Sequence, residues 1–321
     1  MLGHDLRRVV IVSIVAMAVA IGVIIALAVV SGVQSVGSAF SHFRADWLIV
    51  LAIAEAMTVP AYLLGYRTIL GFESKPPRLP LAIWLVLAGF GPFAVRGGFG
   101  LDHRAQRMLG SDSESARVRV LALSAMEWTV LAPAAWIAAI VLLVTGAHAM
   151  ASLLWPWAVI TPIAMVAILW ATAPERDLHW LERSRVRGPA HALDALRIVH
   201  AMLRRPLRSS PAWLGTLGYW VADIAALYAA CRMFGLRVGV AGVIVAYGTG
   251  YVLTRRSLPL AGAGIIEFLL TYALHWVGEP LAPALAAVIA YRVFNLFLAT
   301  APALFAHRRL ARSLATAPGG R

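Results

Sequence analysis

Long apolar stretches separated by short polar ones run through the whole chain. They cover residues 9–33, 47–70, 80–96, 118–145, 153–173, 213–234, 238–254, 259–277 and 281–306. Apolar runs of about 18 or more residues are typical of membrane-spanning helices, whereas strands of a membrane β-barrel alternate weakly over about ten residues. The pattern therefore predicts an all-α polytopic membrane protein.

Basic residues give the expected orientation of these segments. Arg7 and Arg8 precede the first segment, arginines follow the last one, and the loop 174–212 carries eight arginines. The short loops 146–152 and 278–280 carry no basic residue. Because positive loops stay in the cytoplasm, we expect both termini and the basic loop on the cytoplasmic side of the plasma membrane.

Nine crossings would place the two termini on opposite sides, so one segment should not cross. The candidate is 80–96, which is short, is interrupted by Gly89, Gly91 and Pro92, and has basic residues on both sides. Irregular backbone is tolerated at membrane depth where protein or water covers it. We therefore expect about eight transmembrane helices and one segment that re-enters from the cytoplasm.

The chain is expected to form one transmembrane domain over 1–321. Its first half spans about 1–173 and its second half about 213–306, with a basic interfacial loop at 174–212 and a short cytoplasmic tail at 307–321. In the loop, one helical face carries Ala192, Leu196, Val199 and Leu203, and another carries Asp194, Arg197, Arg204 and Arg208. This spacing favours an amphipathic helix on the inner leaflet, with a solvated connecting helix as the alternative.

Composition agrees with the membrane interpretation and excludes several other classes. The chain is 61% hydrophobic and 13% charged, with a mean hydropathy of +0.79 and a net charge of +13. Orientation and anionic lipid explain that charge, and there is no aromatic-interleaved basic groove, so nucleic acid is not expected as a partner. Cys231 is the only cysteine, the histidines lack metal-ligand spacing, and we expect no cofactor.

The N-terminal apolar run is about 25 residues long. It lacks a small-x-small cleavage site, so we expect a first transmembrane helix rather than a removed signal.

Five ionisable residues are the best candidates for charges deep inside the apolar segments: Glu55, Glu127, Asp223, Glu267 and Arg292. A charge at the bilayer centre costs about 2.5–3.5 kcal/mol on insertion scales, so such residues usually face the bundle interior and pair with something. Glu55 and Glu127 have no partner visible in the sequence.

Glu267 and Arg292 lie at similar distances from the turn near Glu279. At 1.5 Å rise per residue both are roughly 18–20 Å from it, which is a matched depth in an antiparallel hairpin. If both faces turn inward, the two side chains form an ion pair. The plain interpretation is a structural pair that fixes the register of the hairpin.

The same region also permits a functional interpretation. Gly262 and Gly264 open the start of a helix, where free N–H groups and the helix dipole favour an anion such as a lipid phosphate. Arg255 and Arg256 stand just before it, although inner-leaflet anchoring is an alternative role for them. Glu267 and Asp223 would then meet a cationic head group or carry protons, and Asn295, one turn from Arg292, would bond in the same cavity.

Two stretches suggest a degenerate inverted repeat. RGGFGLD, residues 96–102, is followed by Gly110 and a span with Glu127. LAGAGIIE, residues 260–267, is followed by Gly278 and a span with Arg292. Matching broken segments in two halves point to a transporter site between repeats, which adds Arg96 and Glu127 to the candidate lipid-binding residues.

The C-terminal third resembles the lysylphosphatidylglycerol synthase transmembrane region, a family also described as flippase-like membrane proteins. That family has a Pro-Gly-Gly-x-Gly-x-x-Glu type break before its penultimate hydrophobic segment. Here PLAGAG, residues 259–264, precedes Glu267, and Leu260 and Ala261 replace expected small residues. The turn Gly278-Glu279-Pro280 and the helix ALAAVIAYRVFNLF complete the match. The first half fits more loosely, at YRTILG, at the glycines near residue 98 and at Glu127.

The resemblance implies a lipid translocator for an anionic or aminoacylated phospholipid or a polyprenyl-linked glycan. Known relatives fuse this region to a soluble aminoacyl transfer domain. This sequence ends about 15 residues after its last apolar segment. We therefore expect no synthase activity and no catalytic residues in it.

Two other functions stay open. The alternative is a non-catalytic membrane partner that docks a cytoplasmic lipid- or envelope-synthesis enzyme through its Arg-rich loop. An intramembrane lipid-modifying enzyme is the third candidate, but no nucleophile–base pair, metal set or nucleotide-type phosphate loop is visible. Membrane phospholipids are the expected partners in every case.

Overall fold

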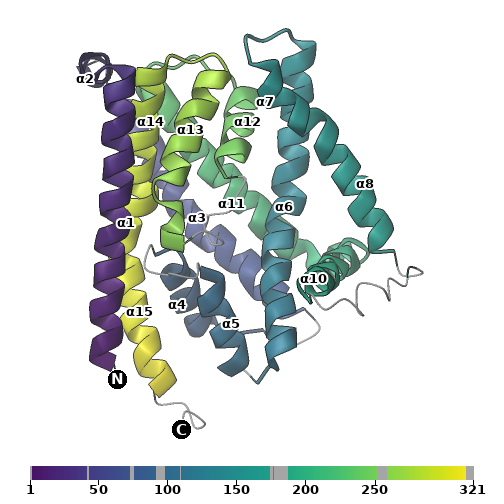
Figure 1. Ribbon diagram of the computed structural model, residues 1–321. Coiled ribbons are helices and arrows are strands. Elements are labelled where there is room, and N and C mark those ends of the chain that lie inside the picture. Colours follow the sequence, from purple (N-terminus) through teal and green to yellow (C-terminus); the bar gives the residue numbers. More distant parts are fainter. Residues whose placement is uncertain are drawn as a thin grey trace.

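The computed structural model describes residues 2–41, 43–72, 76–91, 98–108, 110–173, 176, 187–251 and 259–315, and all regular secondary structure among them is helical. Most helices stand side by side along one axis (Figure 1). The two chain termini lie at the same end of this bundle. The expected all-α polytopic membrane class is thus confirmed.

The first half begins with one long and one short helix, and then has two short helices between two long ones. Helix α1 (Leu2–Ser31) runs the length of the bundle from the N-terminus, and α2 (Val33–Ser41) turns at its far end. Helix α3 (Asp46–Leu70) returns toward the end that holds the termini. Two short helices follow there, and a long one then runs back: α4 (Leu79–Gly89), α5 (Gly98–Met108) and α6 (Ser113–Val144).

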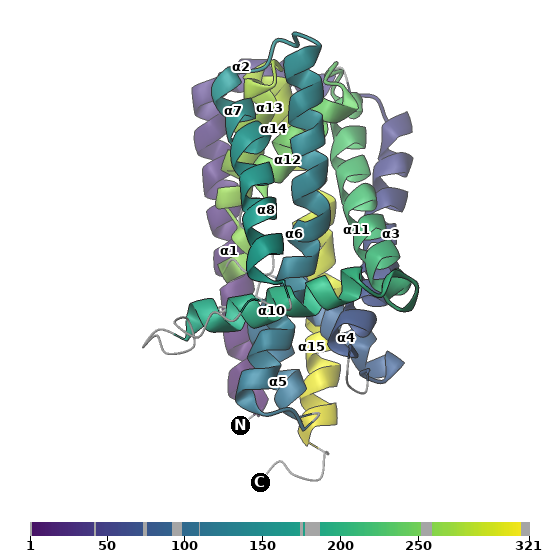
Figure 2. The ribbon, with the colours of Figure 1, turned by 90° about the vertical axis from the view of Figure 1, so that its right-hand side faces the viewer.

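The second half repeats the order long, short, short, long in the opposite direction. A rod of α7, η1 and α8 returns from α6, α10 lies across the other helices (Figure 2), and α11 runs away from the termini. The short α12 and α13 and the long α14–α15 rod follow. The bounds are α7 Ala151–Trp155, η1 Pro156–Ile160, α8 Thr161–Ala171, α10 Gly188–Leu203, α11 Pro206–Met233, α12 Val240–Gly250, η2 Pro259–Gly262, α13 Ile265–Trp276, α14 Leu281–Arg292, η3 Val293–Leu298 and α15 Ala299–Ala315.

Six helices in the described part of the chain are long and apolar enough to cross a membrane, rather than about eight. The difference lies at 238–254 and 259–277, where the structure has the short helices α12 and α13. At 1.5 Å per residue each is roughly 16–18 Å long, whereas the hydrocarbon core is about 30 Å thick. Hydropathy cannot separate a crossing helix from a half-length one, and this is why the expectation was too high.

The two short helices form an antiparallel pair. Gly250 at the end of α12 packs on Leu270 in α13, and Gly242 at its start lies near Val277. The start of α12 and the end of α13 therefore face the end of the bundle opposite the termini. The segment expected to re-enter at 80–96 contains α4, which at eleven residues is also too short to cross.

Helices α3 and α11 cross at backbone contact. A Cβ atom on Gly215 would lie 2.3 Å from the Gly65 nitrogen and 2.8 Å from the Ala61 oxygen. Two long helices from different halves can approach this closely only because glycine presents no side chain. This crossing places Glu55 and Asp223, on the two helices, in one interior.

Helix α10 confirms a helix in the basic loop. Its buried positions include His191, Ala195, Val199 and Met202, whereas Ala192 and Leu203 are exposed. The buried side packs against α6, where His191 contacts Glu114 at 3.1 Å. The amphipathic helix on the inner leaflet stays a prediction.

The two short loops without Lys or Arg, 146–152 and 278–280, meet at one end of the bundle. The Met150 N–H donates to the Trp276 carbonyl at 2.8 Å, and Gly278 lies against the His148 carbonyl. The termini lie at the opposite end, so the structure agrees with the relative placement of loops and termini that the charges predict.

Candidate functional site

A strained backbone segment precedes helix α13. Leu260 and Ala261 both adopt left-handed conformations, with φ of 57° and 52°. Gly262 and Gly264 follow at 69° and 85°. Glycine is favoured at these positions, because a Cβ atom in the left-handed region costs about 1–2 kcal/mol per residue.

Glu267 caps the helix in which it lies. Its Oε2 accepts a hydrogen bond of 2.7 Å from the Gly264 N–H, which is the N-cap of α13. An anion was expected at this helix start, and the one found there is the side chain of Glu267 itself. This corrects the proposal that the N–H group at Gly264 receives a lipid phosphate.

The other oxygen of Glu267 makes the predicted ion pair. Its Oε1 accepts from Arg292 Nε at 2.7 Å, and both side chains are fully buried. Glu267 therefore makes two contacts: one oxygen caps α13, and the other pairs with Arg292 on α14. The matched depth of the two residues about the turn is confirmed.

Asp223 on α11 lies at the centre of a second set of bonds. Its carboxylate accepts from Tyr247 at 2.5 Å and from Tyr291 at 2.7 Å. Tyr291 also bonds to Tyr251 at 2.6 Å, and the rings of Tyr247 and Tyr251 stack. Two buried tyrosines, from α12 and α14, thus bond to one carboxylate, and a third, at the C-terminal end of α12, bonds to Tyr291.

Asn295 joins the two sets. Its Oδ1 accepts from Arg292 at 3.0 Å, and its Nδ2 donates to Asp223 at 3.3 Å and to Glu55 at 3.1 Å. The result is one connected polar network in the membrane interior, drawn from α3, α11, α12, α13, α14 and η3. We call it the central network; its members are Glu55, Asp223, Tyr247, Tyr251, Glu267, Tyr291, Arg292 and Asn295.

One donor in the central network is unused. Arg292 Nη2 is buried and has no hydrogen-bond partner among the described residues. A buried unsatisfied donor on a charged group costs more than one on a neutral group, so native structures rarely keep one without a reason. It marks a place where an acceptor, such as a phosphate oxygen, would be stabilised.

Glu127 lies in a second polar cluster. It accepts from Tyr62 at 2.9 Å, and its backbone carbonyl accepts from the Trp220 indole at 2.9 Å. On the same side of α3, Tyr66 donates to Asp102 at 2.7 Å. The Trp220 ring packs edge-on against Tyr247, so this cluster adjoins the central network.

Three predicted site residues, Arg96, Arg255 and Arg256, lie outside the described residues. Gly262 and Gly264 shape the break, and Asp223, Glu267, Arg292 and Asn295 share the central network. The described part of the chain contains no group of His, Cys, Asp or Glu side chains suited to a metal ion.

Sequence reasoning missed the three tyrosines and the partner of Glu55. A tyrosine in an apolar span is common, so the residue type alone carries no signal. The usable signal is the one-turn spacing of Tyr247 to Tyr251 and of Tyr291 to Asn295, which places each pair on one helical face. Glu55 and Asn295 are 240 residues apart, a contact that only the fold reveals.

The comparisons with known proteins now bear on this geometry. No curated protein matches the chain. The family model described as "Lysylphosphatidylglycerol synthase TM region" matches residues 13–303, which include every described member of the central network and both sets of short helices. The chain therefore belongs to the lysylphosphatidylglycerol synthase transmembrane-region family.

Proposed function

We propose that this protein is a lipid translocator and that the central network receives the lipid head group. Family membership supports a function tied to membrane lipid. The observation that carries the finer proposal is the connected, buried central network beside the break. The substrate class we propose is an anionic or aminoacylated phospholipid, with a polyprenyl-linked glycan as a further candidate.

An ion pair that only held α13 and α14 in register would need no charged residues beyond Glu267 and Arg292. The central network adds the carboxylates of Glu55 and Asp223, together with an amide and three phenols. Intramembrane ionisable groups are costly, so a set of this size is better explained by a head group that it must bind. Arg292 Nη2 supplies a donor for a phosphate, and Asp223 and Glu55 supply carboxylates for an ammonium group.

The members of the central network differ in burial, and this difference supports a lateral route from the lipid to the network. Glu267, Arg292 and Asp223 are fully buried, whereas Glu55 is only partly buried. Its neighbours Ile53 and Met57 on α3 are 60% and 54% exposed. A head group would therefore approach laterally past α3 while its acyl chains stay in the bilayer.

Transport in proteoliposomes tests the proposal. Fluorescent phosphatidylglycerol, its lysyl ester and phosphatidylcholine are placed in the outer leaflet, and the quenchable fraction is followed over time. We expect the wild type to move one or both of the first two faster than empty vesicles do. Failure to move them, together with failure to move a polyprenyl-linked glycan, would contradict the proposal.

Asp223→Asn tests the role of the central network in the same assay. Asparagine keeps the shape and accepts hydrogen bonds, but removes the charge. We expect a loss of about tenfold or more for the lysyl ester, because an ammonium group loses its counter-charge. Asp46→Asn is the matched control, since Asp46 pairs with Arg44 at the exposed start of α3. Equal transport by both variants would count against a binding role for Asp223.

The second candidate function, a membrane partner for a cytoplasmic enzyme, is favoured by the exposed arginines around α10. Arg187, Arg204 and Arg205 are all exposed. A docking role predicts that activity in cells depends on these arginines and is indifferent to neutralising Glu267 and Arg292. On either function we expect no catalysis by this chain.

A further inference from the structure

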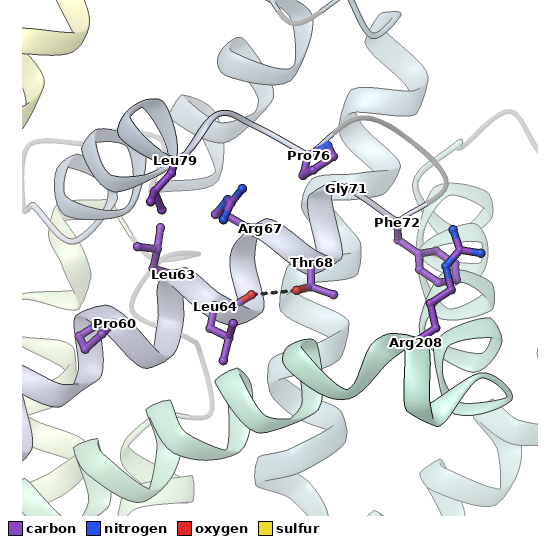
Figure 3. Close-up of a pocket in the computed structure, with 10 residues that line it drawn as sticks. All are labelled: Pro60, Leu63, Leu64, Arg67, Thr68, Gly71, Phe72, Pro76, Leu79 and Arg208. Carbon is purple, nitrogen blue, oxygen red and sulfur yellow. Dashed lines mark hydrogen bonds between the residues drawn. The ribbon is translucent and has the colours of Figure 1, made fainter.

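A cavity separate from the central network lies between the C-terminal end of α3 and the start of α11. Its volume is about 460 Å³. Figure 3 shows its lining residues: Pro60, Leu63, Leu64, Arg67, Thr68, Gly71, Phe72, Pro76, Leu79 and Arg208. It shares no residue with the central network, and it lies at the end of the bundle that holds both termini.

One glycine allows a close contact at the edge of the cavity. A Cβ atom on Gly71 would lie 2.7 Å from the Pro76 side chain and 2.9 Å from the Arg67 carbonyl. Arg67 also donates from Nε to the Pro77 carbonyl at 3.3 Å, which holds the guanidinium at this edge. The cavity is therefore preformed by local contacts in the described residues.

The cavity has an apolar end and a basic end along the axis of α3. Pro60, Leu63 and Leu64 form its apolar part, one to two turns deeper in the span than Arg67. Seven residues of helix separate Pro60 from Arg67, which is roughly 10 Å along the axis. Leu64 is 46% exposed, so this apolar part faces the surrounding bilayer.

Two arginines stand at the outer end of the cavity. Figure 3 shows Arg67 on the side of Leu79 and Pro76, and Arg208, from the first turn of α11, beside Phe72. Among the described lining residues there is no carboxylate. The planar guanidinium group suits phosphate, and two such groups above an apolar wall at the edge of a span match a phospholipid.

We propose that this cavity binds the anionic head group of a phospholipid through the positive charges of Arg67 and Arg208, with an acyl chain along Leu63 and Leu64. The volume suits a head group and glycerol, whereas the chains lie outside against α3. The inference goes beyond the proposed transport function, because the two sites share no residue. Its failure would leave the central network untouched.

Lipid binding to the purified full chain in a neutral detergent tests the proposal. Native mass spectrometry counts the bound short-chain phosphatidylglycerol over a titration, with phosphatidylcholine and inorganic phosphate as the other probes. We expect phosphatidylglycerol to bind and Arg67→Gln/Arg208→Gln to weaken its binding at least tenfold. Arg208→Gln alone, at an exposed position, should weaken it about threefold to tenfold, because a charge-assisted bond to phosphate is lost.

Arg204→Gln is the matched control, since Arg204 is exposed, lies four residues from Arg208 and does not line the cavity. It should change the binding less than twofold. An equal loss in Arg204→Gln would show general attraction to basic residues and overturn the proposal. Competition by inorganic phosphate at the same concentration would show a phosphate site rather than a lipid site, and unaltered binding in Arg208→Gln would remove the cavity from consideration.

Discussion

Removing one charge of the Glu267–Arg292 pair should destabilise the protein far more than removing both. Arg292→Met leaves the Glu267 carboxylate buried without its counter-charge. Glu267→Gln keeps an acceptor for the Gly264 N–H but strands the guanidinium. Because both side chains are fully buried, each single change should cost about 3–5 kcal/mol of unfolding free energy.

The double variant Glu267→Gln/Arg292→Met buries no charge at this position. Replacing a buried ion pair by neutral residues of similar volume is often close to neutral. Two unit charges about 4 Å apart attract by about 4 kcal/mol at an effective dielectric constant near 20. We therefore expect the double variant to cost at least about 3 kcal/mol less than the sum of the two single changes.

Denaturant unfolding of the four proteins in one detergent, followed by tryptophan fluorescence, gives the coupling energy. The helix cap provides an internal check, because Glu267→Gln should leave the start of α13 protected from hydrogen exchange. Additive single and double variants would refute the reasoning, since they would show that the two buried groups do not interact energetically.

Three other changes test the local account of the fold. Gly215→Ala should lower the free energy of unfolding by about 1–3 kcal/mol or more, because its Cβ would lie 2.3 Å from the Gly65 backbone nitrogen. Gly218→Ala meets only a methyl group at 3.3 Å, so thermal unfolding should show a smaller loss for it. Ala261→Gly should leave the melting temperature unchanged or raised and Ala261→Val should lower it, because φ at this position is 52°; equal melting temperatures would contradict strain there. The hydrogen bond from the Ser115 side chain is the main reason that the pKa of Asp112 falls from 3.8 to about 2. The folded pKa lies below the unfolded one, so this cap stabilises the start of α6 fully above about pH 4 and is lost as the pH falls toward 2. Hydrogen exchange at the first turn of α6 should show that loss in the wild type and not in Asp112→Asn, whose side chain does not titrate.

The class of the protein and one contact between two side chains could be predicted from the sequence. Apolar run lengths predicted a polytopic α-helical membrane protein, and the distances of Glu267 and Arg292 from the turn predicted their pairing. Both rest on local periodicity and on one hairpin, which is why they are accessible without the fold.

The features that could not be predicted from the sequence depend on contacts between distant segments. Asn295 meets Glu55 because η3 packs against α3 in the folded chain. The half-length of α12 is not visible in hydropathy. The role of Leu260 as a strained residue likewise needs the backbone angles.

The central claim is that the central network binds a lipid head group rather than only holding α13 and α14 in register. The most direct test is the rate at which Glu267→Gln/Arg292→Met moves fluorescent phosphatidylglycerol and its lysyl ester, at equal amounts of folded protein and beside Asp46→Asn. The account predicts at least a tenfold loss relative to wild type, with the control near wild type. Transport at the wild-type rate by this uncharged double variant would contradict it and leave the pair a structural one.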